Sequence, residues 1–143
     1  LYDYVVRGFL KEALLTLASQ LKLQAPKSKV DKYLFVAPRH IPLCDPATGQ
    51  PVTEPDGVFE RSLRAMTMQG PRVTLAGSET VDAWQLRIDL TLLDNDKTAK
   101  SAALTWEAVE AALDYGRLQG LGQFRNGGFG RFGWERAENE RDD

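Results

Sequence analysis

The apolar positions near the start of the chain repeat with the period of an α-helix. From Val6 to Leu21 they recur every three or four residues, which places them on one face of an amphipathic helix. The helix is expected to end before Ala25 and Pro26, because proline disfavours helical geometry in the residue that precedes it. The basic segment that follows, residues 27–32, is predicted to be a connection.

Strand patterns occupy the middle of the chain. Residues 33–37 form a short run of β-forming side chains, and a similar run covers residues 72–76. Apolar and polar residues alternate over residues 62–69 and more strictly over residues 84–93, as in strands of an antiparallel sheet with one wetter face. Segment 42–57 is rich in proline and glycine and is predicted to be a long loop.

A second helix is predicted to begin at Trp106. Thr105 is suited to cap its N-terminus, and Glu107 in the first turn is suited to the helix dipole. The helix leads into a glycine-rich loop, and residues 131–136 are predicted to form a last short strand.

This order of elements predicts an α+β fold, in which an antiparallel sheet carries two helices on one face and a glycine-rich loop follows the second helix. The chain opens on Leu1. If a strand precedes this residue, the order becomes β-α-β-β-α-β, which is the ferredoxin-like or RRM-like plan. We therefore expect one ferredoxin-like domain over residues 1–136, followed by a solvated acidic tail over residues 137–143.

Composition narrows the class of protein. With 143 residues, 43% of them hydrophobic and 27% charged, the chain has the size and balance of one globular domain. No apolar run is long enough to span a membrane, and the charges of Arg7, Lys11 and Glu12 interrupt the first apolar stretch, so no signal peptide is expected. Cys44 is the single cysteine, which excludes an intramolecular disulfide and indicates a reducing, cytoplasmic compartment.

Charge is distributed unevenly along the chain. The net charge is −2, but residues 1–40 hold seven Lys or Arg against Asp3, Glu12 and Asp31, a local excess of four. This segregation predicts a basic face near the N-terminal helix.

The segment GLGQFRNGGFGRFGW, residues 120–134, contains six glycines, so its backbone is suited to close approach. It matches neither a dinucleotide fingerprint nor a phosphate-binding P-loop. Its arginines could contact a sugar-phosphate backbone while its phenylalanines stack on bases. The alternative is a tight turn whose glycines pack helix against sheet, with the phenylalanines in the core. The candidate side chains around this loop are Arg117, Phe124, Arg125, Phe129, Arg131 and Phe132.

The loop resembles the C-terminal glycine-rich loop of the RAMP superfamily, the ferredoxin-like proteins of CRISPR effector complexes. The run from Val6 to Lys11, VRGFLK, is similar to the motif that opens their first helix. The resemblance implies an RNA-binding subunit whose first helix and loop lie along a nucleic-acid strand. By position it assigns Arg7, Gly8 and Lys11 from the helix and Gly120, Gly122, Arg125, Gly128 and Gly130 from the loop.

The ending GLG-x-x-R-x-G is also similar to that of small phage proteins. This second likeness implies a phage or mobile-element origin, and hence the cytoplasm of a bacterial host or of an infected cell.

Candidates for catalysis are few. His40 is the single histidine. Some RAMP endonucleases use one histidine as general acid or base for RNA cleavage, and the resemblance implies the same role for His40. Asp45 in the proline-rich loop is a second candidate, because resembling subunits use a loop aspartate. The alternative for His40 is an ordinary loop residue. One His and one Cys make no zinc site, and the spacing at Asp94 to Asp96 fails as a Ca²⁺ loop, so neither a metal nor a cofactor is expected.

The sequence thus predicts a protein that binds single-stranded nucleic acid, RNA rather than DNA. Binding without catalysis is favoured over an enzymatic activity. Two alternatives remain open. One is an assembly module on the same fold, which binds other protein subunits or copies of itself, as a phage-encoded structural protein would. The other is a metal-independent endoribonuclease that uses His40. No membrane partner is expected.

Overall fold

The structure is a computed structural model that describes residues 1–67, 70–95, 102–122 and 129–137. The chain divides into two compact units, of which unit 1 comprises Leu1–Ile41 and Ile88–Asp143, and unit 2 comprises Pro42–Arg87. Residues 1–136, which the sequence predicts as one domain, therefore contain parts of two compact units.

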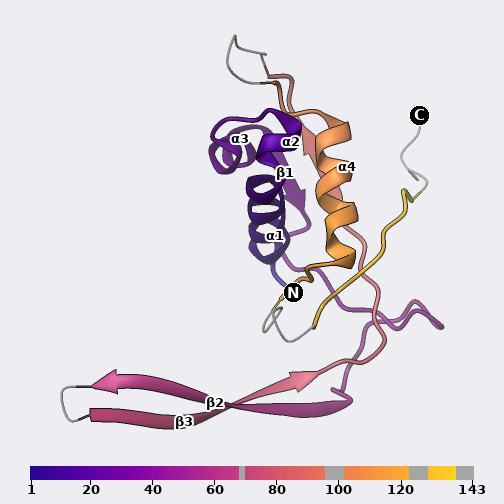
Figure 1. The fold of residues 1–143 in the computed structure, drawn as a ribbon. Helices are drawn as coiled ribbons and strands as arrows, with labels where there is room; N and C mark the ends of the chain where they lie inside the picture. Colours follow the sequence, from indigo (N-terminus) through magenta and orange to yellow (C-terminus); the bar gives the residue numbers. More distant parts are fainter. Residues whose placement is uncertain (68–69, 96–101, 123–128, 138–143) are drawn as a thin grey trace. The chain divides into compact units, whose positions relative to one another are not determined.

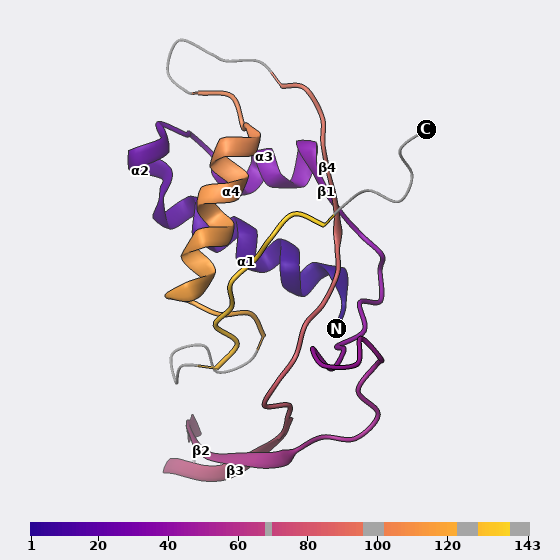
Figure 2. The same ribbon diagram turned by 90° about the vertical axis from the view of Figure 1, so that its right-hand side faces the viewer.

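Unit 1 combines helices with a short antiparallel sheet (Figure 1). Its core is formed around α1, whose buried face contacts α3, α4 and the first strand (Figures 1 and 2). The elements of unit 1 are α1 (Asp3–Thr16), α2 (Ala18–Leu21), α3 (Pro26–Tyr33), β1 (Leu34–Ala37), β4 (Asp89–Leu92), α4 (Trp106–Asp114) and the 3₁₀ turn η1 (Tyr115–Arg117).

The apolar period of the N-terminal segment produces the core as predicted. The residues that recur every three or four positions in α1 are buried and face the neighbouring elements. Residues from α3, β1 and α4 complete the core. The buried hydrophobic residues are Val6, Phe9, Leu10, Ala13, Leu14, Leu23, Val30, Leu34, Val36, Ile41, Leu104, Ala108, Val109 and Ala112.

The prediction of a connection over residues 27–32 is wrong, because these residues belong to α3. Pro26 stands in the first turn of this helix, where its fixed φ is favourable and its missing N–H is not needed. The helix is held to the core by Pro26 and Val30, the latter with 0% exposure. One buried apolar residue amid charged neighbours is too sparse a pattern to show helical periodicity.

The second predicted helix is confirmed as α4. Its N-cap is Thr105, whose Oγ1 accepts a hydrogen bond from the backbone N–H of Ala108 at 3.3 Å.

The sheet of unit 1 consists of β1 and β4, which pair antiparallel. Leu34 lies opposite Leu92 and Val36 opposite Leu90, so these four apolar residues share one face, whereas Phe35 lies exposed on the other. The strand predicted over residues 84–93 is shorter than expected, because β1 offers a pairing partner of only four residues. The fold is therefore α+β with antiparallel pairing, as predicted, while each sheet among the described residues has two strands.

The segment predicted as a last strand, residues 131–136, takes a different place. It forms no strand and runs along α4 instead, within unit 1 (Figure 2). The Phe132 N–H donates to the Gly116 carbonyl, and the Trp134 Nε1–H donates to Asp114 Oδ1 at 2.8 Å. Arg136 pairs with Glu110 one turn earlier in α4. Residues 131–136 are thus held by side chains of α4 and by the carbonyl of Gly116, where pairing with a strand was expected.

Residues 1–3 lie antiparallel to residues 39–41. The Leu1 amine donates to the Ile41 carbonyl at 2.9 Å, and the Ile41 N–H donates back to the Leu1 carbonyl at 2.6 Å. The Asp3 N–H donates to the Arg39 carbonyl at 2.9 Å. These bonds fix the start of α1 beside the chain that leaves β1.

Unit 2 is a loop followed by a long β-hairpin. Strands β2 (Gly57–Thr67) and β3 (Gly70–Thr80) pair antiparallel in continuous register from Gly57 opposite Thr80 to Thr67 opposite Gly70. They include the strands predicted over residues 62–69 and 72–76, of which residues 68–69 lie outside the description. Bridges from Cys44 to Pro51 and to Gln85 organise the loop that precedes the hairpin. In the part of the chain that the structure describes, no helix is long and apolar enough to cross a membrane.

Unit 1 is predicted to fold without unit 2. Residues 42–87 would be replaced by a short glycine–serine linker, which can bridge the gap because Ala37 and Asp89 lie opposite each other in the sheet. Every buried hydrophobic residue whose burial the structure describes lies outside the removed segment, so a single cooperative thermal transition should remain, measured by circular dichroism. Loss of that transition, with the full chain melting cooperatively as control, would contradict this prediction.

Candidate nucleic-acid interface

The helix-opening motif lies in the first half of α1, on the side of the helix that the core leaves partly open. Arg7 and Lys11 are one turn apart and share a face of the helix, with Gly8 next to Arg7. All three are half-buried, whereas Phe9 and Leu10 point into the core. The structure therefore brings together the three residues that the resemblance assigns to this helix.

No contact or backbone angle among the described residues requires a glycine at position 8. Its backbone is helical and its φ is not positive, and a Cβ built on it would meet no atom within 4 Å. Glycine inside a helix is less stable than alanine by about 0.5–1 kcal/mol. Since packing within the described chain does not require it, Gly8 fits a surface that something else approaches closely.

Acidic neighbours accompany both cations of the motif. The Arg7 guanidinium lies 3.6 Å from the carboxylate of Asp3, one turn earlier in α1, and Lys11 Nζ lies 2.5 Å from Asp31 Oδ1. The side chains of Arg7 and Lys11 keep 38% and 27% exposure. Ion pairs at a surface contribute at most about 1 kcal/mol, so the loss of either pair costs little. The carboxylates of Asp3 and Asp31 stay nearby and oppose a phosphate by repulsion.

Two segments of the glycine-rich loop, residues 120–121 and 129–131, lie close together. A Cβ on Gly120 would overlap the backbone of residues 129–131, and a Cβ on Gly130 would overlap the backbone of Leu121. The Leu121 N–H donates to the Gly130 carbonyl at 2.9 Å, and Gly130 has a φ of +80°, which favours glycine. These two glycines therefore let the two arms of the loop come together, which favours the tight turn among the two sequence interpretations.

Phe132 belongs to the packing of unit 1. Its ring covers Gly116, where a Cβ would collide with it, and it meets the ring of Phe9 edge-on with the centroids 5.1 Å apart. Gly116 is thus small because an aromatic ring lies on it. This phenylalanine supports the fold, as the turn interpretation expects.

The other candidates of the loop are distributed as follows. Arg117 at the end of η1 and Arg131 after Gly130 are exposed, and Phe129 is half-buried and engaged in a contact. Gly122 has a φ of +84° and open space around it, so a backbone turn explains it. Phe124, Arg125 and Gly128 lie outside the residues that the structure describes.

The catalytic candidates belong to different units. His40 is exposed at the end of unit 1, where its ring lies 4.6 Å from that of Tyr2. Asp45 lies in the loop of unit 2, and its Oδ1 accepts a hydrogen bond from the Ala47 N–H at 2.8 Å. The Asp45 carboxylate thus closes a turn, which is an ordinary structural use of aspartate.

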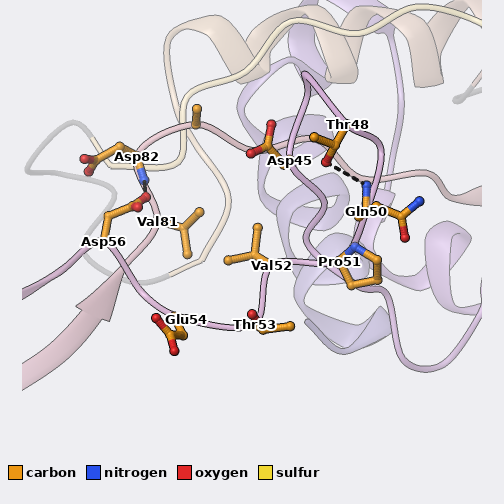
Figure 3. A pocket seen from close by; sticks show the side chains of 11 residues that line it. Asp45, Thr48, Gln50, Pro51, Val52, Thr53, Glu54, Asp56, Val81 and Asp82 are labelled. Atoms are coloured by element: carbon orange, nitrogen blue, oxygen red, sulfur yellow. Dashed lines mark hydrogen bonds between the residues drawn. The ribbon is translucent and has the colours of Figure 1, made fainter.

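A hollow of about 450 Å³ in unit 2 is lined by carboxylates and does not suit a polyanion (Figure 3). Asp45, Glu54, Asp56 and Asp82 lie around it, and Asp56 Oδ2 accepts a hydrogen bond from the Asp82 N–H at 2.7 Å. Negative charge would repel phosphates here. Among the residues that the structure describes, no group of His, Cys, Asp or Glu is placed to hold a metal ion.

Two exposed tyrosines next to the motif were not singled out from the sequence. Tyr2 and Tyr4 stack on each other beside His40, with 43% and 63% of their surfaces exposed. A signal was present, since two aromatic residues precede a basic helix motif, but the contact with His40 joins distant parts of the chain.

Comparisons with protein-family models, with curated proteins and with solved structures found no match to this chain. The candidate interface is therefore defined by its own geometry: a glycine on an open helix face, flanked by two cations, with exposed aromatic rings one turn away.

The two kinds of glycine predict opposite effects of substitution by alanine. Gly120→Ala should lower the free energy of unfolding by about 1–3 kcal/mol, because the new Cβ overlaps backbone atoms that cannot shift freely. Gly8→Ala should raise it by about 0.5–1 kcal/mol, because the Cβ meets open space. Urea unfolding of both variants measures this contrast. Equal effects of the same sign would show that the loop is not closed by glycine.

Proposed function

We propose that this chain binds single-stranded nucleic acid, RNA in preference to DNA, through the face of α1 that carries Arg7, Gly8 and Lys11, and does not cleave it. The observation that carries the proposal is Gly8, a destabilising glycine in a helix with open space where its side chain would be. A strand backbone that passes over Gly8 would place its phosphates next to Arg7 and Lys11.

Charge supports this choice of ligand. Phosphate contacts from Arg and Lys dominate affinity for nucleic acids, and binding weakens as salt rises because counterions are released. Residues 1–40 hold a local excess of four basic residues, although the chain as a whole is acidic. We therefore place the bound strand along the face of α1 that carries Arg7 and Lys11.

In this proposal the described part of the glycine-rich loop contributes charge. Gly120 and Gly130 serve the closure of the loop, and the exposed Arg117 and Arg131 at its base are the side chains that would reach a phosphate. Arg125, which lies outside the described residues, is proposed to do the same on the strength of the resemblance.

The resemblance to the RAMP superfamily supports the same assignment, and we extend the proposal to a ferredoxin-like plan for unit 1. In that plan β1 and β4 would be two strands of a larger sheet. The relation to phage-encoded proteins and a cytoplasmic location belong to the proposal in the same way.

An assembly module is the second candidate, and the hairpin of unit 2 favours it. Strands β2 and β3 pair only with each other in the described residues, which leaves the outer edge of each strand without a strand partner. Such edges can pair with another protein subunit or with a second copy of the chain. This candidate does not depend on the α1 face and predicts no effect of Gly8 on assembly.

Gly8→Ala separates binding from stability. If a strand passes over Gly8, the added methyl group should weaken binding of a fluorescein-labelled single-stranded RNA by about tenfold, a loss of about 1.4 kcal/mol, although the protein becomes more stable. Fluorescence anisotropy measures the affinity and thermal unfolding the stability. Wild-type affinity in the stabilised variant would contradict the assignment of this face.

Lys11→Glu should weaken binding and reduce the dependence of affinity on salt, because it removes one phosphate contact. The matched control is Lys22→Glu, which makes the same charge change at an exposed residue after α2, beyond the far end of α1. Titrations at several salt concentrations compare the two variants. Equal losses in both would show that net charge and not the α1 face determines affinity.

A further inference from the structure

We propose that Tyr4, Tyr2 and His40 form a stacking platform for unpaired nucleobases, which extends the strip formed by Arg7, Gly8 and Lys11. This inference rests on the proposed function. It adds a second contact to the ligand: besides the phosphates, the protein would bind the flat faces of the bases in a single strand.

The three rings form a continuous row at the surface. The rings of Tyr2 and Tyr4 are nearly parallel, with an angle of 13° and centroids 5.4 Å apart, and the ring of His40 lies 4.6 Å from that of Tyr2 at an angle of 52°. Tyr2 therefore lies in the middle of the row, and Tyr4 is at its open end.

All three residues of the row are exposed. Tyr4 exposes 63% of its surface and Tyr2 exposes 43%, and His40 is exposed as well. Aromatic side chains contribute most when their large apolar area is buried, so a stacked pair left in solvent is suited to bury that area against a ligand. A nucleobase offers a flat π face of matching size.

Backbone hydrogen bonds hold the row in place before any ligand binds. Residues 1–3 are fixed against residues 39–41 by the paired bonds between Leu1 and Ile41 and by the bond from Asp3 to Arg39. Tyr2 and His40 face each other within this ladder. Tyr4 stands in the first turn of α1 and is therefore fixed by the helix. Such preorganisation lowers the entropy lost on binding.

The row continues into the basic strip. Tyr4, Gly8 and Lys11 stand at positions i, i+4 and i+7 of α1, so they lie along one side of the helix. Arg7 is three residues after Tyr4, and the exposed Arg39 precedes His40. Asp3 is the acidic group next to the row and is paired with Arg7. A strand that passes over Gly8 with its phosphates near the cations would place its bases toward Tyr4.

This arrangement selects single strands by its chemistry. Bases in a duplex are already stacked on both faces and cannot lie on Tyr4, whereas the bases of a single strand can. Stacking on aromatic residues tolerates every base, so the platform favours unpaired bases without choosing a sequence.

The test compares two fluorescein-labelled oligoribonucleotides of equal length, one that carries uracil throughout and one whose central residues are abasic, so that the phosphates match. Wild-type full-length protein should bind the base-bearing strand about tenfold more tightly than the abasic one. Tyr4→Leu should remove this difference, while Tyr4→Phe, which keeps the ring, should retain it. Phe35→Leu, at an exposed aromatic residue of β1 outside the row, should leave it unchanged.

The outcomes separate this inference from the proposed function. Equal affinity of the wild-type protein for both strands overturns the platform while phosphate binding stands, and this comparison decides even where Tyr4→Leu does not fold. A base preference that persists in Tyr4→Leu also overturns it. If the protein binds neither strand, both proposals are wrong. A row of rings that contacts a protein partner would give this result.

Discussion

The burial of one face of α1 is the constraint on which unit 1 depends. Leu10 and Leu14 are fully buried, and the helix contacts α3, α4 and β1 through the same face. Because that face is committed to the core, the helix presents the opposite side to its surroundings. Tyr4, Gly8 and Lys11 lie there. The position of the candidate interface is thus a consequence of how the core is built.

The glycines of this chain have two physical explanations, and separating them changes the functional picture. In the loop, Gly120 and Gly130 allow two backbone arms to touch, and Gly116 makes room for the ring of Phe132. These contacts are internal and account for three glycines of that region. Gly8 has no such contact among the residues that the structure describes. The glycine on which the proposed interface rests is therefore the isolated one in the helix.

Local patterns predicted some of the elements, and contacts between distant residues decided the rest. The period of α1, the Thr105 cap and the first strand all follow from neighbouring residues. Helix α3 was missed because Pro26 and Val30 are its only buried residues, and β4 is short because its partner is short. Arg7, Gly8 and Lys11 could be placed on one helix from the sequence, whereas the contacts of Lys11 with Asp31 and of Tyr2 with His40 could not.

Binding of the wild-type protein to nucleic acid tests the central claim most directly. Fluorescence anisotropy would compare labelled single-stranded RNA, single-stranded DNA and duplex DNA at several salt concentrations. The account predicts micromolar or tighter binding of single strands, RNA above DNA and both above duplex, with an affinity that falls steeply as salt rises. Absence of binding to every probe at low salt would contradict it, and would favour a protein partner for this chain.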